Sequence, residues 1–176
     1  MYSKKGFVII CLVILSTLLL TSCLPSTTVI TSETSEEYFT FDSTTGIITG
    51  YDIAGGLDVV LPFMIGGVAV EHIGIDAFYQ NYLTSVIIPD SVTSIGTCGF
   101  SANQLTSVTI PDSVTSIGSR AFAYNQLTSV TIGADVDINS YPDTMGINTG
   151  FKTVYDGGGK LAGTYNYTGG GVWVKV

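Results

Sequence analysis

The stretch that decides the fold is Leu83-Thr84-Ser85-Val86-Ile87-Ile88-Pro89-Asp90-Ser91-Val92-Thr93-Ser94-Ile95-Gly96. It returns almost unchanged, 22 residues later, as Leu105-Thr106-Ser107-Val108-Thr109-Ile110-Pro111-Asp112-Ser113-Val114-Thr115-Ser116-Ile117-Gly118. Self-similarity at a fixed period of this length is typical of proteins whose repeats stack on one another. We therefore predict that these two copies form adjacent coils of one solenoid.

The repeat continues in weaker form on both sides of the two clean copies. A third copy starts at Leu127 and diverges after Ile132, and a degenerate copy precedes Leu83. Three columns stay in register through the first three units: Gly74, Gly96 and Gly118; Phe78, Phe100 and Phe122; Asn81, Asn103 and Asn125. We predict a mainly β fold, a short solenoid of about four coils of 22 residues with one strand each.

The pattern inside one unit predicts its path. Val108-Thr109-Ile110 alternates as a strand does when one face is buried. Pro111 and Asp112 end that strand and begin a turn. Gly118 indicates a second bend, where either a side chain would crowd the backbone or φ is positive. One unit buries too few apolar side chains to fold alone, so the units are expected to share a continuous core.

The motif Leu-x-x-Val-x-Ile-Pro-x-x-Val-x-x-Ile-Gly-x-x-Ala-Phe, seen from Leu105 to Phe122, resembles the BspA-type leucine-rich repeat of bacterial surface proteins. The resemblance covers about Thr45 to Val176 and implies a leucine-rich-repeat solenoid with an adhesive role. Residues 46–51 and 65–70 resemble the opening unit of that family. Pro62 lies 11 residues before Ile73, against 6 in the clean copies, so this unit carries a five-residue insertion.

The last residues are expected to cap the solenoid. Phe151–Tyr155 and Ala162–Tyr165 resemble a C-terminal segment of related lipoproteins. A β-hairpin is predicted over the open edge of the last coil. Its strands are Tyr165–Tyr167 and Val172–Val174, joined by a turn at Gly169–Gly171. The predicted domain begins with a degenerate N-terminal unit at residues 38–82, followed by clean repeats at residues 83–104 and 105–126. A divergent repeat at residues 127–150 and a C-terminal cap at residues 151–176 complete it.

The N-terminus has the pattern of an export signal. Lys4 and Lys5 precede a mostly apolar stretch from Phe7 to Leu20. At about 14 residues this stretch is short for a bilayer span of about 20, which favours a signal peptide over residues 1–22. An ordinary secretory signal with a chance cysteine at the cleavage site is the alternative.

Leu20-Thr21-Ser22-Cys23 resembles the lipobox of bacterial lipoproteins. The resemblance implies that Cys23 is acylated and becomes the new N-terminus, with two or three acyl chains inserted in the lipid bilayer. The Ser/Thr-rich segment up to residue 37 is then a flexible tether. These features predict a bacterial cell-envelope location, with the outer membrane or cell surface favoured because Leu24 carries no acidic retention signal.

Charge and cysteine content argue against a nucleic-acid partner and against an intrachain disulfide. Without Lys4 and Lys5, four basic side chains face 14 acidic ones, a net charge of −10. Such a chain repels phosphate, so we expect no nucleic-acid partner. Cys11 leaves with the signal and Cys23 is lipidated, which leaves Cys98 alone and excludes an intrachain disulfide.

No combination of residues predicts catalysis, a cofactor or a metal. His72 is the only histidine and reads as a surface residue. Asp135–Asn139 begins like a calcium loop, but Ser140 and Gly146 stand where Gly and Glu are needed, so Val136 and Ile138 read better as an inward strand face. Gly157–Lys160 lacks the flanking residues of a P-loop and reads as a turn.

Two further features leave alternatives open. Cys98 shares its column with Asp76 and Arg120, which predicts an exposed thiol, either incidental or available for an intermolecular disulfide. An enzymatic use of Tyr155, Tyr165 and Trp173 as a sugar platform competes with simple packing in the cap. We favour packing because no pair of carboxylates accompanies them.

The outward strand positions form the candidate binding face, a ribbon of small hydroxyls with one apolar member: Thr84, Ser85, Ile87, Thr106, Ser107, Thr109, Thr128, Ser129 and Thr131. Leucine-rich solenoids commonly bind partners on such a face, although a solvated β-surface has the same composition. We predict a membrane-anchored, non-enzymatic binding or adhesion module for a protein or glycan ligand. The alternative is a structural or self-associating envelope lipoprotein.

Overall fold

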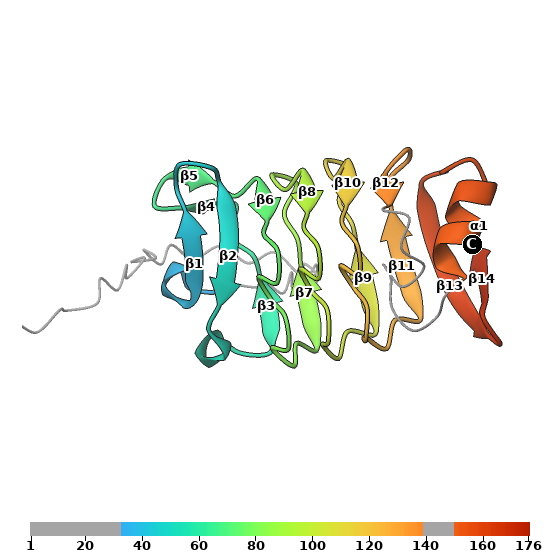
Figure 1. Ribbon diagram of the computed structural model, residues 1–176, viewed down its shortest axis with the longest axis horizontal. Helices are drawn as coiled ribbons and strands as arrows, with labels where there is room; N and C mark the ends of the chain where they lie inside the picture. The colour runs from blue at the N-terminus through green and yellow to red at the C-terminus, as the bar shows by residue number, and fades with distance from the viewer. Residues whose placement is uncertain (1–32, 139–149) are drawn as a thin grey trace, which may run out of the picture. The chain divides into compact units, whose positions relative to one another are not determined.

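The computed structural model describes residues 33–138 and 150–176, and Cys23 lies outside these ranges. The described residues form short strands in two rows, each following chain order along the stack of coils (Figure 1). The helices in these ranges are too short or too polar to span a bilayer. The predicted mainly β solenoid of 22-residue coils is confirmed.

The first row is a six-stranded sheet in the order β1-β2-β6-β8-β10-β12, parallel except for the β1–β2 hairpin. Its strands are β1 (Phe39–Asp42), β2 (Ile47–Tyr51), β6 (His72–Ile73), β8 (Ser94–Ile95), β10 (Ser116–Ile117) and β12 (Asp137–Ile138). The predicted repeat register holds in this row, since Ser94 pairs with Ser116 and Ile95 with Ile117.

The second row holds the strand that the sequence predicts in each coil. It consists of a β3–β7 pair and a sheet in the order β9-β11-β13-β14. Its strands are β3 (Asp58–Val60), β7 (Ser85–Ile87), β9 (Ser107–Thr109), β11 (Ser129–Ile132), β13 (Gly163–Gly169) and β14 (Val172–Lys175). β9 and β11 are parallel, with Val108 opposite Val130.

The expectation of one strand in each coil is wrong, because each coil contributes a strand to both rows. The second strand is only two residues long in β8, β10 and β12, too short for an alternating pattern to be visible in the sequence. The third coil is also one residue shorter, since Ser107 pairs with Ser129 whereas Ser116 pairs with Asp137.

The glycine column of the repeat lies where adjacent coils approach most closely. A Cβ on Gly118 would meet the backbone nitrogen of Thr97 at 2.6 Å, and one on Gly96 would meet the carbonyl carbon of Gly74 at 2.8 Å. Neither glycine has a positive φ. Of the two reasons considered for this column, backbone crowding is therefore the correct one.

Left-handed backbone occurs instead in columns without glycine. Asp76, Cys98 and Arg120 have φ of 57°, 53° and 56°, and Gln80, Ala102 and Tyr124 all have φ of 56°. Non-glycine residues adopt this conformation at a cost, so each coil maintains two strained positions through its surrounding hydrogen bonds.

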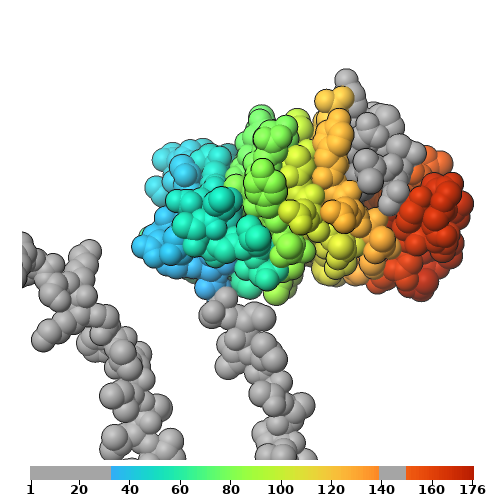
Figure 2. Space-filling model, turned by 90° about the horizontal axis from the view of Figure 1, so that it is seen from below, coloured from blue at the N-terminus to red at the C-terminus, as the bar shows by residue number. Residues whose placement is uncertain are grey.

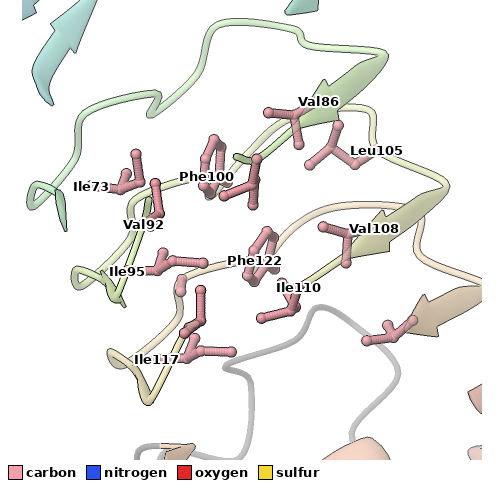
Figure 3. Close-up of a cluster of buried hydrophobic side chains, with 14 of the residues drawn as sticks. Ile73, Val86, Val92, Ile95, Phe100, Leu105, Val108, Ile110, Ile117 and Phe122 are labelled. Atoms are coloured by element: carbon pink, nitrogen blue, oxygen red, sulfur yellow. The ribbon is translucent and has the colours of Figure 1, made fainter. Parts of the chain in front are cut away.

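Inward side chains from both rows form one core along the stack. Figure 3 shows its members, with one isoleucine column and one valine column on opposite sides of stacked phenylalanine rings: Ile73, Ile95 and Ile117; Val86 and Val108; Phe100 and Phe122. Phe78 stacks on Phe100 at 4.9 Å between ring centroids, and Phe100 on Phe122 at 5.3 Å. The repeat period thus places identical side chains in direct contact.

A ladder of buried asparagines runs beside the phenylalanine stack. Asn125 donates through Nδ2 to the carbonyl oxygens of Phe100 and Phe122, both at 2.9 Å, and accepts from the Leu105 N–H at 3.0 Å. Asn103 makes the equivalent bonds one coil earlier. Each asparagine therefore satisfies backbone groups of two coils where the chain turns.

The N-terminal unit closes the first end of the core. The predicted five-residue insertion is a small hairpin of β4 (Met64–Ile65) and β5 (Val68–Ala69). The domain begins earlier than the predicted residue 38, because Thr34 bonds to both the N–H and the carbonyl of Val60. Two short 3-10 helices, η1 (Glu36–Tyr38) and η2 (Ile53–Gly55), complete this unit.

The C-terminal cap contains the predicted hairpin and a helix that the sequence reading missed. β13 pairs antiparallel with both β11 and β14, so the hairpin covers the edge of the last strand as expected. The helix α1 (Phe151–Gly157) adds Phe151 and Tyr155 to the core. The Tyr155 hydroxyl donates to the Gly133 carbonyl at 2.7 Å and accepts from the Val136 N–H at 3.0 Å.

Candidate functional site

The structure places all nine residues of the predicted binding face on the solvent side of the second row. Ser85 and Ile87 flank buried Val86 on β7, and Ser107 and Thr109 flank buried Val108 on β9. Thr84, Thr106 and Thr128 precede these strands and are exposed. The nine positions are therefore brought together as a row; whether they bind a partner remains a prediction.

This line of nine side chains, which we name the hydroxyl row, is polar in its middle, and apolar side chains lie at both of its ends. Parallel pairing sets Ser107 beside Ser129 and Thr109 beside Thr131. At the N-terminal end Val60 lies beside Ile87, which is 49% exposed. At the C-terminal end β14 exposes Val172 and Val174. Uniform hydroxyl character is thus limited to β9 and β11 and their flanks.

Some hydroxyls of the row are already engaged. Ser129 Oγ donates to Asn166 Oδ1 at 2.9 Å, and the hydroxyls of Thr131 and Thr164 lie 2.8 Å apart. Both contacts come from β13, which leaves Ser129 and Thr131 half-buried. The cap therefore satisfies the hydroxyls of β11, while Ser107 and Thr109 are exposed.

One carboxylate is built into the row. Asp58 Oδ1 accepts from Thr84 Oγ1 at 2.6 Å and from Ser85 Oγ at 2.8 Å. These hydrogen bonds, Thr84 first, hold the pKa of Asp58 below its ordinary value of 3.8. The sequence reading missed Asp58 because its spacing of 27 residues from Ser85 includes the insertion.

The single histidine lies on the opposite row. His72 Nδ1 lies 2.8 Å from Ser94 Oγ and 3.3 Å from Thr93 Oγ1, and the ring is half-buried. Its hydrogen-bonding neighbours are hydroxyls of the next coil. Its interpretation as a structural surface residue agrees with this environment.

The described residues of the two segments compared with a calcium loop and a P-loop belong to the core and to the end of a helix. Val136 and Ile138 are buried, as predicted for an inward strand face, and Asn139 lies outside the described residues. Gly157–Lys160 ends α1, with the Gly158 and Lys160 N–H groups bonded to the Val154 and Tyr155 carbonyls. Within residues 33–138 and 150–176, no three His, Cys, Asp or Glu side chains group to hold a metal ion.

Cys98 is less accessible than its column predicts. The side chain is half-buried. Burial, and then the nearby Asp76 carboxylate, raise the pKa of the thiol, and Arg120 opposes them. A protonated, half-buried thiol is a weak nucleophile, so this environment favours an incidental cysteine.

The aromatic side chains considered as a sugar platform pack inside the cap. Tyr155, Tyr165 and Trp173 are all buried. Phe151 contacts Tyr165 and Trp173 edge to face, at 5.4 and 5.2 Å between centroids. These rings seal the end of the core and present no face to a sugar.

A different set of aromatics is exposed, and the sequence reading missed it. Tyr79, Tyr82 and Tyr124 are 44%, 60% and 63% exposed. They lie in the segments that turn into β7 and β11, beside the asparagine ladder. Their signal is a departure from the repeat, because the equivalent positions elsewhere hold Ser, Ala or Gln.

Comparison with known proteins found a family model and a solved structure that are similar to parts of this chain. Residues 70–143 match the model of the BspA-type leucine-rich repeat region, which is less than half of the chain and narrower than the resemblance read from the sequence. A crystal structure of a leucine-rich repeat protein from T. pallidum is similar at 24% identity and a TM-score of 0.36, covering 56% of this chain and 71% of that one. None of the curated proteins matches the sequence.

The periodic coils, their two rows of strands and the glycine, phenylalanine and asparagine columns define the architecture independently of any relative. The described domain is a leucine-rich-repeat solenoid whose residues 70–143 are similar to the BspA-type repeat region.

Proposed function

We propose that this protein is a non-enzymatic binding module, held at the bacterial cell envelope by acylated Cys23 and displayed for adhesion to a protein or glycan. The single observation that carries the binding role is the row of solvent-facing side chains on a stacked, capped core. Repeat solenoids present such extended surfaces to partners.

The surroundings of the side chains considered for chemistry agree with the same proposal. In the described residues His72 faces only hydroxyls, Cys98 is half-buried, and the cap aromatics are internal. The cap strand β13 forms hydrogen bonds with Ser129 and Thr131, whereas Ser107 and Thr109 stay exposed and form the polar centre of the hydroxyl row. This centre has the hydroxyl donors and acceptors that a polar interface requires.

The anchor is tested by substitution of the lipobox cysteine. A Cys23→Ser chain, compared with the unchanged chain in the same bacterium, is expected to lose incorporation of labelled fatty acid. Cys98→Ser is the matched control and should keep the label. Equal labelling of the Cys23→Ser chain and the unchanged chain would contradict acylation at Cys23.

The binding role is tested with the chain displayed on intact cells. Serum, extracellular-matrix and envelope fractions are passed over cells that carry the unchanged chain or a Ser107→Lys/Thr109→Lys chain. We expect retained components that the lysine variant releases. If the unchanged chain retains nothing more than cells without the chain, the binding role is wrong.

Self-association is the second candidate, favoured by the exposed valines of the terminal strand. Val172, Val174 and Val176 are 52%, 45% and 73% exposed on or next to β14, the last strand of its sheet. Sedimentation of the detergent-solubilised chain distinguishes the two roles. A monomer at all concentrations would exclude self-association, and a concentration-dependent oligomer that Val174→Lys dissolves would favour it.

A further inference from the structure

The turns before β7, β9 and β11 carry an uncharged aromatic and amide surface. It consists of Tyr79, Gln80, Tyr82, Gln104, Tyr124 and Gln126, all exposed, which we name the tyrosine–glutamine corner. The three segments 79–82, 101–104 and 123–126 contain no charged residue, in a chain with 14 acidic side chains. The corner is therefore a neutral strip on an acidic protein.

The corner is held in place by backbone hydrogen bonds between coils. The Gln80 N–H donates to the Ser101 carbonyl at 3.1 Å, and the Ala102 N–H to the Ala123 carbonyl at 2.9 Å. The Gln104 and Gln126 N–H groups bond to Leu83 and Leu105 at 2.9 Å. Because β7, β9 and β11 stand side by side in chain order (Figure 1), the segments entering them are stacked as well.

The spacing limits the size of any partner surface. Strands in a ladder lie about 4.8 Å apart, so the first and third segments are about 10 Å apart. A stable protein interface has about 20–30 residues on each partner, whereas the corner consists of six. A few linked sugar rings match its length. Figure 2 shows the solenoid from below, with the coils in the same order along its length.

The side-chain chemistry also favours a sugar. A tyrosine ring is an apolar plate with a polar tip, on which the C–H face of a sugar ring can stack. Carboxamides both donate and accept hydrogen bonds, as sugar hydroxyls do. The corner has no aliphatic side chain of the kind that protein interfaces bury and no cation for sulfate, sialate or phosphate.

We infer that the tyrosine–glutamine corner binds a neutral oligosaccharide, with Tyr82 and Tyr124 as stacking platforms and Gln104 and Gln126 as hydrogen-bonding partners. This inference rests on the proposed binding role and names its ligand class, but it uses a surface other than the hydroxyl row.

The test uses the full chain in a zwitterionic detergent without a sugar headgroup. A printed array of neutral, sialylated and sulfated oligosaccharides identifies a retained probe, and calorimetry with that probe measures affinity. We expect retention on neutral probes only. Tyr82→Gln and Tyr124→Gln should each weaken binding by about tenfold, as loss of an aromatic contact does.

The variants come from the repeat itself. Gln occupies the position of Tyr82 in the next two coils, although Tyr82 alone of these three residues has a left-handed backbone, with φ of 59°. Gln80 occupies the position of Tyr124 with the same φ of 56°, and so shows that Gln is accommodated in that conformation. Ile75→Thr, which takes the residue of Thr97 in the next coil at an exposed position after β6, is the control and should leave affinity unchanged. Matching thermal unfolding of all four chains confirms that only the surface differs.

Three results would overturn the inference: retention of no neutral probe, preference for anionic probes, or affinity unchanged by both tyrosine variants. If cells still retain a partner through Ser107 and Thr109 in any of these cases, the proposed function stands and the glycan assignment alone fails. If cells retain nothing either, both fail.

Discussion

Single buried side chains join adjacent coils of this solenoid, and the asparagine ladder shows how. Asn125 is 1% exposed and saturates backbone groups of two coils with its one amide. Asn81 begins the same column, but its amide makes one long bond of 3.5 Å, to Tyr51. Asn81 and Asn125 occupy equivalent repeat positions, but we therefore expect them to contribute unequally to the free energy of unfolding.

Asn125→Ala tests this difference. The substitution leaves the Leu105 N–H and the Phe122 carbonyl buried without this partner, while the Phe100 carbonyl still accepts from Asn103, so the free energy of unfolding should fall by about 3 kcal/mol. Asn81→Ala is the matched control, with an expected loss below about 1 kcal/mol. Urea unfolding measures both, and equal losses would contradict the ladder.

The glycine column makes a second prediction at this scale. A Cβ on Gly118 lies 2.6 Å from backbone, which a side chain cannot relieve, so Gly118→Ala should destabilise by about 1–3 kcal/mol. Gly157→Ala is the control, because its Cβ meets nothing within 4 Å and φ is not positive; a gain of about 0.5–1 kcal/mol is expected there. Thermal unfolding of both chains distinguishes crowding from a general preference for glycine.

Pairs of elements decide how the ends of the solenoid are closed. β3 is joined to β7 by backbone pairing and by the Asp58 carboxylate, whereas β11 is closed by β13. The first closure depends on a titratable group and the second on strand pairing. Low pH should therefore weaken the N-terminal end of the solenoid, and removal of β13 should weaken the C-terminal end.

Asp58 predicts a pH dependence. Its pKa is lowered in the folded chain, so the unfolded chain binds the proton more readily, and the stabilisation present above the unfolded pKa is lost as pH falls through the folded pKa. The difference in unfolding free energy between the unchanged chain and Asp58→Asn should shrink between about pH 6 and about pH 3. A difference independent of pH would show that the hydrogen bonds do not favour the ionised form.

Removal of residues 159–176 should expose the edge of β11. This strand carries Val130, Thr131 and Ile132, whose β-branched side chains favour strand pairing, so the truncated chain is expected to self-associate at micromolar concentration. Adding Thr131→Lys should suppress the association by placing a charge on the edge. Sedimentation velocity reports both, and a monomeric truncated chain would contradict the capping role of the hairpin.

Charge is distributed unevenly over the whole domain. Residues 33–119 hold ten acidic side chains and no Lys or Arg, and the four cations of the domain lie at Arg120, Lys152, Lys160 and Lys175. Lys152 and Asp156 form an ion pair within α1, in the C-terminal part of the domain. Repulsion within the N-terminal half is thus largely uncompensated.

Salt should therefore stabilise the protein. Raising NaCl from about 10 mM to about 150 mM shortens the screening length from about 30 Å to about 8 Å, and we expect a gain of about 1 kcal/mol in unfolding free energy. Asp90→Asn, which removes one exposed charge of the acidic half, should reduce the gain. A loss of stability on adding salt would mean that attractive pairs dominate.

The sequence predicted the coil length, the inward columns and the C-terminal hairpin because a repeated pattern reports the same environment several times. It could not predict β6, β8, β10 and β12, which are two residues long, or α1, whose seven residues lie in a non-repeated segment. It also treated the nine hydroxyl-row residues as equivalent, although β13 engages Ser129 and Thr131 and leaves Ser107 and Thr109 exposed.

By itself, the sequence determined that this chain is a solenoid of 22-residue coils, because period and polarity together specify which side chains must be buried. Tertiary structure alone decided why the glycines are required, which hydroxyls are free, and that the exposed tyrosines share a corner with glutamines. The physical reason is distance: these properties depend on atoms of neighbouring coils, about 22 residues away in the chain and within a few ångströms in space.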